Sequence, residues 1–404
     1  MDKKIKVGIL RETKIPPDRR VALPPSLCIE LCQRFPDVEI YVQPSELRAY
    51  KDDEYESLGI NMQKDLSKCD ILIGIKEVDK STFVANKTYI FFAHVGKMQH
   101  YNQKMMQTMV EKKLTLIDYE YLTDVNDIRL VAFGRWAGIV GTYNAFLGWG
   151  LRTGDYSMRR AIDCHDMKEF FTELRHTKLG PVKILVTGGG RVSHGAMEVL
   201  EHLLIRKISS YEYLHKTFDE PVYCQLEPWD YVERKDSNAF DFKHFAKHPH
   251  EYHSSFIPYT EVTDLLITAH FWDPRSPKFF TAQEMQKPEF KIRLIADISC
   301  DIDGPIPSTL RSSTIAEPFY GYNVHTSQEG QPFDQHHITI MAVDNLPGEA
   351  PRDASLDFGL DLIIRIFPSL FGEDSDNIIE RATILKDGEL THKFRYLECY
   401  ARGE

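Results

Sequence analysis

The sequence has no cysteine framework and no long apolar run. None of its seven cysteines is spaced as Cys-x-x-Cys, and an odd number without a framework indicates reduced thiols. No apolar stretch approaches the roughly 18 residues that a membrane span needs. The N-terminal MDKKIKVGILRETK has a strand-like run and charges instead of the apolar segment of a signal peptide. We therefore expect a cytoplasmic protein with no membrane partner.

The sequence is also short of positive charge. Its 60 Asp and Glu residues against 49 Lys and Arg give a formal net charge of −11, which argues against nucleic acid as the main partner. A hydrophobic fraction of 42% is enough for packed cores and excludes a disordered chain. At 404 residues the chain exceeds what one core usually covers, so two domains are expected.

Short apolar runs alternate with amphipathic stretches along most of the chain. Strands are predicted at residues 5–10, 38–43, 70–76, 88–94 and 114–122, and a second series begins at 182. This alternation is typical of βαβ units, so the predicted fold class is α/β with parallel sheets flanked by helices. Ligands bind such sheets beyond the carboxyl ends of the strands.

Two consecutive predicted strands end in a side chain that can carry a proton. The run ILIGI leads into Lys76, and IFFA leads into His94, with Lys97 close behind. Because parallel strands end at the same edge of a sheet, we expect Lys76 and His94 to lie close together and to take part in catalysis. The alternative is that Lys76 reaches solvent and His94 caps the sheet through hydrogen bonds.

The segment ILVTGGGRVSHGA has the order strand, glycine cluster, helix. Its glycines allow a tight turn and the approach of a pyrophosphate to the helix N-terminus, which predicts a dinucleotide site. No GKS or GKT is present, which argues against a nucleoside triphosphatase loop. Ser193 stands where the third glycine of the fingerprint is expected. The predicted cofactor-binding residues of this segment are Gly188, Gly189, Gly190, Arg191, Val192 and Ser193.

The acidic residue that usually contacts the adenosine ribose is missing from its expected place, about 20 residues further on. Ser209 lies there instead, near Arg206 and Lys207, and would tolerate a 2′-phosphate. Asp230 follows a later strand candidate and would favour a 2′-hydroxyl. The sequence therefore leaves both NAD and NADP open as the cofactor.

Several charged residues suit a substrate with carboxylates. The loop RETKIPPDRRVALPP contains Asp18 and Arg20, while Glu120 and Arg129 follow another predicted strand. A guanidinium can bind a carboxylate through two hydrogen bonds, so a carboxylate clamp is expected. The alternative is a solvated basic loop.

Four histidines cluster in a polar segment. His244, His248, His250 and His253 do not have the spacing of standard zinc ligands. No metal site is expected.

Together these motifs resemble the saccharopine dehydrogenases that form L-lysine and the lysine–ketoglutarate reductase half of aminoadipic semialdehyde synthase. Both lie within the alanine dehydrogenase and transhydrogenase superfamily. The resemblance covers nearly the whole chain and is carried by RRVALPP, GIKE, FFAHVGKMQ, LIDYEYL, VAFGRWAG, GGGRVSHGA, KHPHEYHSSF, IADISCDIDGPI and VDNLPGEAPRDAS. AFGRWAG and KHPHEYHSSFIPYT favour the reductase half.

The resemblance implies two Rossmann-like domains with the active-site cleft between them. Residues 1–140, completed by 350–404, would form the catalytic and substrate domain. Residues 141–349 would form the dinucleotide-binding domain, with an insertion at about 207–258.

The resemblance also implies roles for individual residues. Lys76 and His94 correspond to the acid–base pair of the family, and Asp344 lies where the family approaches the nicotinamide. Asp18 stands where a Glu is more usual. The implied substrate-binding residues are Arg20, Asp18, Lys97, Glu120 and Arg129.

The implied reaction is the NAD(P)-dependent reductive condensation of L-lysine with 2-oxoglutarate to saccharopine, or its reverse. The partners would be a small amino acid and a 2-oxo acid, and a homo-oligomer is left open. The alternatives are an alanine dehydrogenase, another opine-type N-carboxyalkyl amino acid dehydrogenase, and a non-catalytic nucleotide-binding module. The last has no need for both Lys76 and His94.

Overall fold

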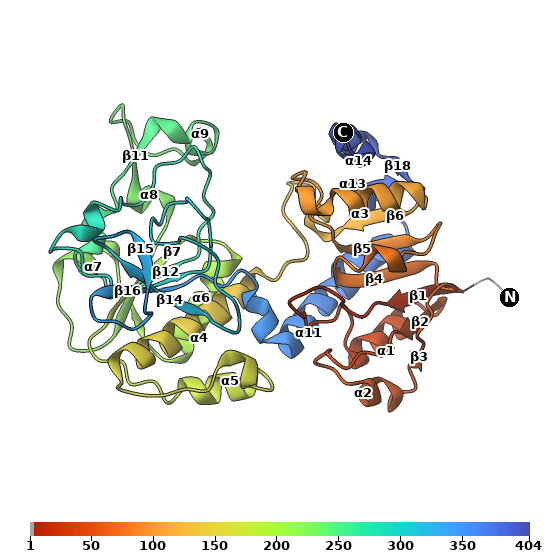
Figure 1. Ribbon diagram of the computed structural model, residues 1–404, viewed down its shortest axis with the longest axis horizontal. Helices are drawn as coiled ribbons and strands as arrows, with labels where there is room; N and C mark the ends of the chain where they lie inside the picture. Colours follow the sequence, from red (N-terminus) through yellow and green to blue (C-terminus); the bar gives the residue numbers. More distant parts are fainter. Residues whose placement is uncertain (1–3) are drawn as a thin grey trace. The chain divides into compact units, whose positions relative to one another are not determined.

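The computed structural model describes residues 4–404, which form two compact units. Unit 1 combines the chain up to Phe133 with Pro351–Glu404, and unit 2 is the continuous stretch Gly134–Ala350. Each unit has its own eight-stranded, mostly parallel sheet with helices packed around it (Figure 1). The predicted α/β fold class is confirmed.

The sheet of unit 1 has the strand order β18-β17-β6-β5-β4-β1-β2-β3. Its strands are β1 Ile5–Ile9, β2 Val38–Val42, β3 Asn61–Met62, β4 Ile71–Lys76, β5 Thr88–Phe92, β6 Thr115–Asp118, β17 Thr383–Lys386 and β18 Glu389–Leu390. All pairs from β6 to β3 are parallel, whereas β17 and β18 are antiparallel additions beside β6. The parallel strands are nearly continuous apolar runs, as expected when both faces of a sheet are covered.

Helices from both segments of unit 1 cover this sheet. They are α1 Pro25–Arg34, α2 Asp52–Glu56, α3 His100–Glu111, α11 Pro351–Asp361, α12 Phe367–Phe371, α13 Ile378–Ala382 and α14 Glu398–Arg402. Apolar residues of β1, β4, β5, α3 and the C-terminal segment form one continuous core. The last segment of the chain also contributes the antiparallel hairpin of β17 and β18.

The sheet of unit 2 has the strand order β15-β14-β16-β13-β12-β7-β9-β8. Its strands are β7 Lys183–Thr187, β8 Arg206–Lys207, β9 Val222–Leu226, β12 Leu265–Thr268, β13 Leu294–Asp297, β14 Phe319–Asn323, β15 Gln328–Gly330 and β16 His337–Met341. The strands from β16 to β8 are parallel, and β14 and β15 close one edge in antiparallel pairs.

Unit 2 has one long helix and several short ones. They are α4 Gly134–Thr153, α5 Met167–Leu174, α6 Arg191–His202, α7 Ser210–His215, α8 Pro228–Tyr231, α9 Phe242–Lys247 and α10 Ile257–Thr260. Helix α4 belongs wholly to unit 2 because it packs closely on α6: a Cβ on Gly138 would overlap the carbonyl oxygen of Val192. The boundary therefore lies at Gly134 and not at 140. No helix within residues 4–404 combines the length and the apolar character needed to cross a membrane.

The expected insertion at about 207–258 is shorter than predicted. Residues 222–226 form β9, which pairs in parallel with β7 inside the main sheet. The added part begins after α8 and consists of the antiparallel strands β10 Val232–Arg234 and β11 Tyr252–Ser254, with α9 between them. Figure 1 shows α9 and β11 together at one edge of unit 2.

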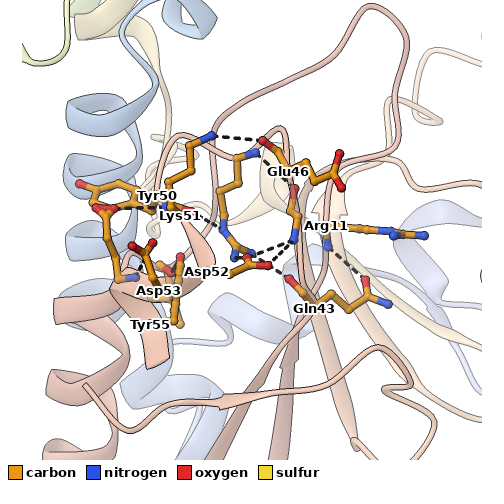
Figure 2. Close-up of polar contacts among 12 residues, drawn as sticks. Arg11, Gln43, Glu46, Tyr50, Lys51, Asp52, Asp53 and Tyr55 are labelled. Carbon is orange, nitrogen blue, oxygen red and sulfur yellow. Dashed lines mark hydrogen bonds and ion pairs between the residues drawn. The ribbon is translucent and has the colours of Figure 1, made fainter. Parts of the chain in front are cut away.

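A polar network fixes the chain where β1 ends (Figure 2). The backbone N–H of Arg11 donates to Gln43 Oε1 at 3.1 Å, in the loop after β2. Buried Arg48 donates to the carbonyl oxygen of Gln43 at 3.0 Å and pairs with Asp52 Oδ1 at 2.5 Å. Glu12 follows Arg11 directly in the chain, so this network also fixes the position of Glu12.

Candidate active site

Lys76 is the last residue of β4, and an irregularity turns the end of that strand. The register between β4 and β5 shifts between Ile73 and Lys76, so β4 carries one extra residue there. Such a bulge redirects the side chains that follow it. Glu12 accepts the freed backbone donors: Ile75 N lies 2.7 Å from Oε1, and Lys76 N lies 2.9 Å from Oε2. The carboxylate thus fixes the strand end that carries Lys76.

The Lys76 amine is largely removed from water and has other cations nearby. Burial, followed by the charges of Arg20 and Lys14, lowers the pKa of Lys76, while Asp18 and Glu77 act in the opposite direction. A lowered pKa increases the neutral fraction of a lysine near pH 7, which is the form that accepts a proton.

His94 follows β5 in a left-handed backbone conformation, with φ of 51°. The residue before it is held on both sides: Ala93 N donates to Asp118 Oδ2 at 3.2 Å, and Asn102 Nδ2 donates to the Ala93 carbonyl at 2.9 Å. A positive φ is uncommon for residues with a Cβ and persists where surrounding contacts hold it. These contacts set the direction of the His94 ring.

One aromatic ring connects Lys76 and His94. Lys76 Nζ lies 5.9 Å from the centroid of the Phe92 ring, and the His94 ring lies 6.1 Å from it with the planes 15° apart. The two predicted proton carriers therefore contact the same ring at neighbouring strand ends. Within residues 4–404, no hydrogen bond joins them directly.

Glu120, in the turn after β6, connects His94 with Arg129. Its Oε1 atom lies 3.8 Å from His94 Nδ1 and 3.4 Å from Arg129 Nη2. The neighbouring His94, followed by Arg129, holds the pKa of Glu120 below its usual range, and Lys97 contributes in the same direction. The ionised carboxylate can stabilise the imidazole ring when that ring carries a second proton.

Arg20 has a partner within the chain. Its Nε and Nη2 atoms donate to the two oxygens of Asp18 at 3.0 and 2.6 Å, and both side chains are only 2% exposed. Its guanidinium also lies 4.3 Å from the centroid of the Phe133 ring. Against burial, which raises it, the Arg20 charge lowers the pKa of Asp18 to about 2. By contrast, half of the Arg129 side chain is exposed, so the two arginines expected to form a clamp have different surroundings.

Sequence reasoning missed two carboxylates beside these residues. Burial raises the pKa of Glu12 to about 8 and that of Asp118 to about 7. Along the strand order β6-β5-β4-β1, every carboxyl end thus supplies one titratable side chain: Asp118, His94, Lys76 and Glu12. The two carboxylates hold the backbone beside His94 and Lys76, which makes them positioning residues. The only sequence signal was a carboxylate at the end of each strand.

In unit 2, the predicted glycine turn opens into a pocket of about 600 Å³. The pocket is lined by residues 188–192 after β7, by the loops after β9 and β12, and by α9. Its volume lies in the usual range for cofactor and small-molecule sites.

The three glycines of the turn are needed for different reasons. Gly188 has φ of 93°, and a Cβ there would lie 2.5 Å from the carbonyl oxygen of Ala269. A Cβ on Gly189 would overlap the Glu227 carboxylate. A Cβ on Gly190, the residue before α6, would meet nothing within 4 Å. This open space at a helix N-terminus, where backbone N–H groups point outward, fits a pyrophosphate.

Ser193 does not line the pocket. Its hydroxyl donates to the Gly190 carbonyl at 2.8 Å and so stabilises the first turn of α6. The close packing expected of the third fingerprint glycine occurs at Gly195, where a Cβ would overlap the carbonyl oxygen of Arg135 in α4. Arg191 and Val192 do line the pocket, and their part in cofactor binding stays a prediction.

Two carboxylates line the pocket: Glu227, directly after β9, and Asp273, in the loop after β12. Asp230 instead accepts the backbone N–H of Glu227 at 2.8 Å, and Ser209 accepts that of Glu212 at 3.3 Å to cap α7. Neither is among the pocket residues. Ser209 and Asp230 as ribose contacts therefore stay a prediction, and Glu227 is a further candidate that the sequence count did not reach, because β8 and α7 separate the glycine turn from β9.

The remaining predicted residues lie outside this pocket. Asp344 is exposed, just beyond the carboxyl end of β16. Three of the four clustered histidines, His244, His248 and His250, lie near Glu251, with His244 Nε2 3.3 Å from Glu251 Oε2, whereas His253 Nε2 lies 3.5 Å from Glu233 Oε2. Over the described residues, 4–404, no group of three or more potential ligands could hold a metal ion.

Comparison with known proteins finds a family match for one part of the chain and two solved structures with a similar fold. Residues 8–140 match the family described as Alanine dehydrogenase/PNT, N-terminal domain. The solved structure of an L-alanine dehydrogenase shares the fold with a TM-score of 0.63 at 15% identity, covering 98% of this chain and 99% of that chain. A transhydrogenase from Sinorhizobium meliloti has a TM-score of 0.58 at 14% identity, covering 96% and 99%. At these identities the likeness concerns the fold alone.

Three curated relatives are similar in sequence to most of this chain. Alpha-aminoadipic semialdehyde synthase of Arabidopsis thaliana is 30% identical over 97% of this chain, which spans only 41% of that protein. The mitochondrial enzyme of that name from Mus musculus is 29% identical over 89% of this chain and 44% of that protein. Saccharopine dehydrogenase (NAD(+), L-lysine-forming) of Schizosaccharomyces pombe is 26% identical, covering 91% of this chain and 92% of that protein. Residues 8–140 therefore match the alanine dehydrogenase/PNT N-terminal domain family, and most of the chain is similar in sequence to saccharopine dehydrogenase and to part of alpha-aminoadipic semialdehyde synthase.

Proposed function

We propose that the chain is an NAD(P)-dependent oxidoreductase of lysine metabolism that condenses L-lysine with 2-oxoglutarate to saccharopine, or catalyses the reverse reaction. The observation that carries this proposal is the edge of the unit 1 sheet. There, Lys76 with its lowered amine pKa and His94 beside ionised Glu120 share the Phe92 ring. The names of the curated relatives support the choice of substrate.

The two proton carriers suit the steps of this reaction. Lys76 takes a proton from the substrate amine, which must be neutral to attack the oxo carbon. His94 gives a proton to the carbinolamine oxygen, which leaves as water. The nicotinamide, when bound, supplies the hydride that reduces the resulting imine. Exposed Arg129 and Lys97 are the cations available to the carboxylates of the substrate.

The residues of unit 2 fit a dinucleotide, and they favour NAD. The space beside Gly190 accepts a pyrophosphate at the N-terminus of α6. Glu227 lies where an acidic residue accepts hydrogen bonds from the ribose 2′-hydroxyl. A 2′-phosphate would bring like charges together there, which lowers affinity for NADP.

The test is a panel of amines and 2-oxo acids, scored by loss of NADH or NADPH absorbance. We expect turnover with lysine and 2-oxoglutarate, and a higher kcat/KM with NADH than with NADPH. Glu227→Ser should reduce or reverse that cofactor preference. Turnover of ammonia and pyruvate instead would identify an alanine dehydrogenase. Binding of NADH without turnover of any pair would identify a non-catalytic module.

A further inference from the structure

Two large aromatic side chains face the pocket of unit 2 without aromatic partners. Phe242, the first residue of α9, is 62% exposed, and Phe271, after β12, is 91% exposed. Within residues 4–404, neither ring stacks on another aromatic side chain, although both line the same pocket. Burying a phenylalanine is normally favourable, so two uncovered rings in one pocket indicate a flat apolar ligand.

The support beneath Phe242 is well packed, in contrast to Phe242 itself. Phe245 of α9 lies 4.9 Å from the ring of Tyr252 in β11, and the Phe240 ring lies 5.7 Å from each of them. Asp241 caps α9 by accepting the backbone N–H of His244 at 2.7 Å. The hairpin and α9 thus form a packed base that fixes the backbone carrying Phe242, which reduces the entropy lost on binding.

The position of the pocket along the sheet indicates which end of a dinucleotide it would hold. The pocket is lined by the loops after β7, β9 and β12, together with α9, and by no residue that follows β13 or β16. Glu227 after β9 is on the adenosine side, because this is where the ribose carboxylate of such folds lies. The nicotinamide end belongs beyond the opposite strands. The flat group beside Glu227 and α9 is therefore the adenine.

We propose that the α9 hairpin, residues 232–254, is an adenine-binding wall, in which Phe242 stacks on the base. The proposal rests on the proposed binding of a dinucleotide and adds a residue that the glycine turn and Glu227 do not imply. The negatively charged phosphates of the dinucleotide would lie at α6, away from the base. The base therefore needs only an apolar surface to stack on, with its own edge exposed to water. Stacking of a base on an aromatic side chain accounts for about a five- to hundredfold change in affinity on alanine substitution.

The test compares binding of NADH, ADP-ribose and reduced nicotinamide mononucleotide, followed by fluorescence or calorimetry. Phe242→Ala should weaken NADH and ADP-ribose by the same factor, about five- to a hundredfold, and leave the mononucleotide unchanged. Phe242→Tyr should retain most of the affinity. Tyr211→Ala is the matched control, since Tyr211 on α7 is 69% exposed and does not line the pocket.

The outcomes separate this inference from the proposed function. If wild-type protein binds no NADH, the dinucleotide proposal fails. If it binds NADH and Phe242→Ala binds all three probes as wild type does, the adenine wall is overturned. A changed oligomeric state of Phe242→Ala with unchanged NADH affinity would overturn it as well, and would assign the ring to a protein contact.

Discussion

The carboxyl edges of the two sheets differ in the groups that they present. In unit 1, four neighbouring strands present Asp118, His94, Lys76 and Glu12, and the backbone around them is held by hydrogen bonds to carboxylates. In unit 2, the equivalent edge presents glycines, a helix N-terminus and empty space. Proton transfer requires side chains with shifted pKa values in fixed positions, whereas pyrophosphate binding requires backbone that a ligand can reach. The same α/β architecture suits both of these proposed roles.

The largest effect should come from removing the proton carriers of unit 1. Lys76→Met and His94→Gln keep approximate size, and each should lower kcat by roughly 10²–10⁴-fold, the usual contribution of positioned acid–base groups. NADH affinity should stay unchanged because the cofactor residues lie in unit 2. Steady-state kinetics and NADH titration measure the two quantities. Lys104→Met, at an exposed position, is the control. Full activity of both site variants would contradict the prediction and would mean that Lys76 and His94 have a structural role.

A smaller effect should follow from filling the space beside Gly190. Gly190→Val adds atoms where a Cβ now meets nothing, so the fold is kept while the pyrophosphate is kept from the α6 N–H groups. Loss of one such charge-assisted hydrogen bond costs about 1.5–3 kcal/mol, or roughly ten- to a hundredfold in NADH affinity. Gly180→Val is matched, since Gly180 also has open space around it but lies outside the pocket. Equal NADH affinity of the two folded variants would contradict the assignment.

An effect on stability and not on activity concerns Glu12 and its pH dependence. Its folded pKa of about 8 exceeds the ordinary value of 4.5, so the folded state binds more protons between these limits. The resulting stabilisation is present below pH 4.5 and is lost as pH rises through 8, at about 1.4 kcal/mol per unit of pKa difference. Urea unfolding from pH 5 to 8 should therefore show a shallower decline for Glu12→Gln than for wild type. Equal slopes would contradict this, and exposed Glu56→Gln should retain the wild-type slope.

The sequence predicted what depends on local pattern. The apolar runs gave the parallel strands, and the strand ends pointed to Lys76 and His94, because period and turn residues are local signals. The hydrogen bonds of Glu12 to the end of β4 could not be predicted, since they join segments far apart in the chain. Glu227 was missed for a related reason. It follows β9, which pairs with β7, but the edge strand β8 comes before β9 in the sequence, so the first strand after the glycine turn is not a neighbour of β7.

The chain order of unit 1 also affects how the protein is synthesised. Unit 2 is continuous, so it can fold as soon as residue 350 has left the ribosome, whereas β17 reaches its place beside β6 only afterwards. At about 5–20 residues per second, translation of unit 2 alone takes roughly ten to forty seconds, during which the outer edge of β6 has no neighbouring strand. An unpaired strand edge can pair with other chains. Nascent unit 1 is therefore the part of this protein with the greatest need of chaperones, and fast translation would shorten its exposure.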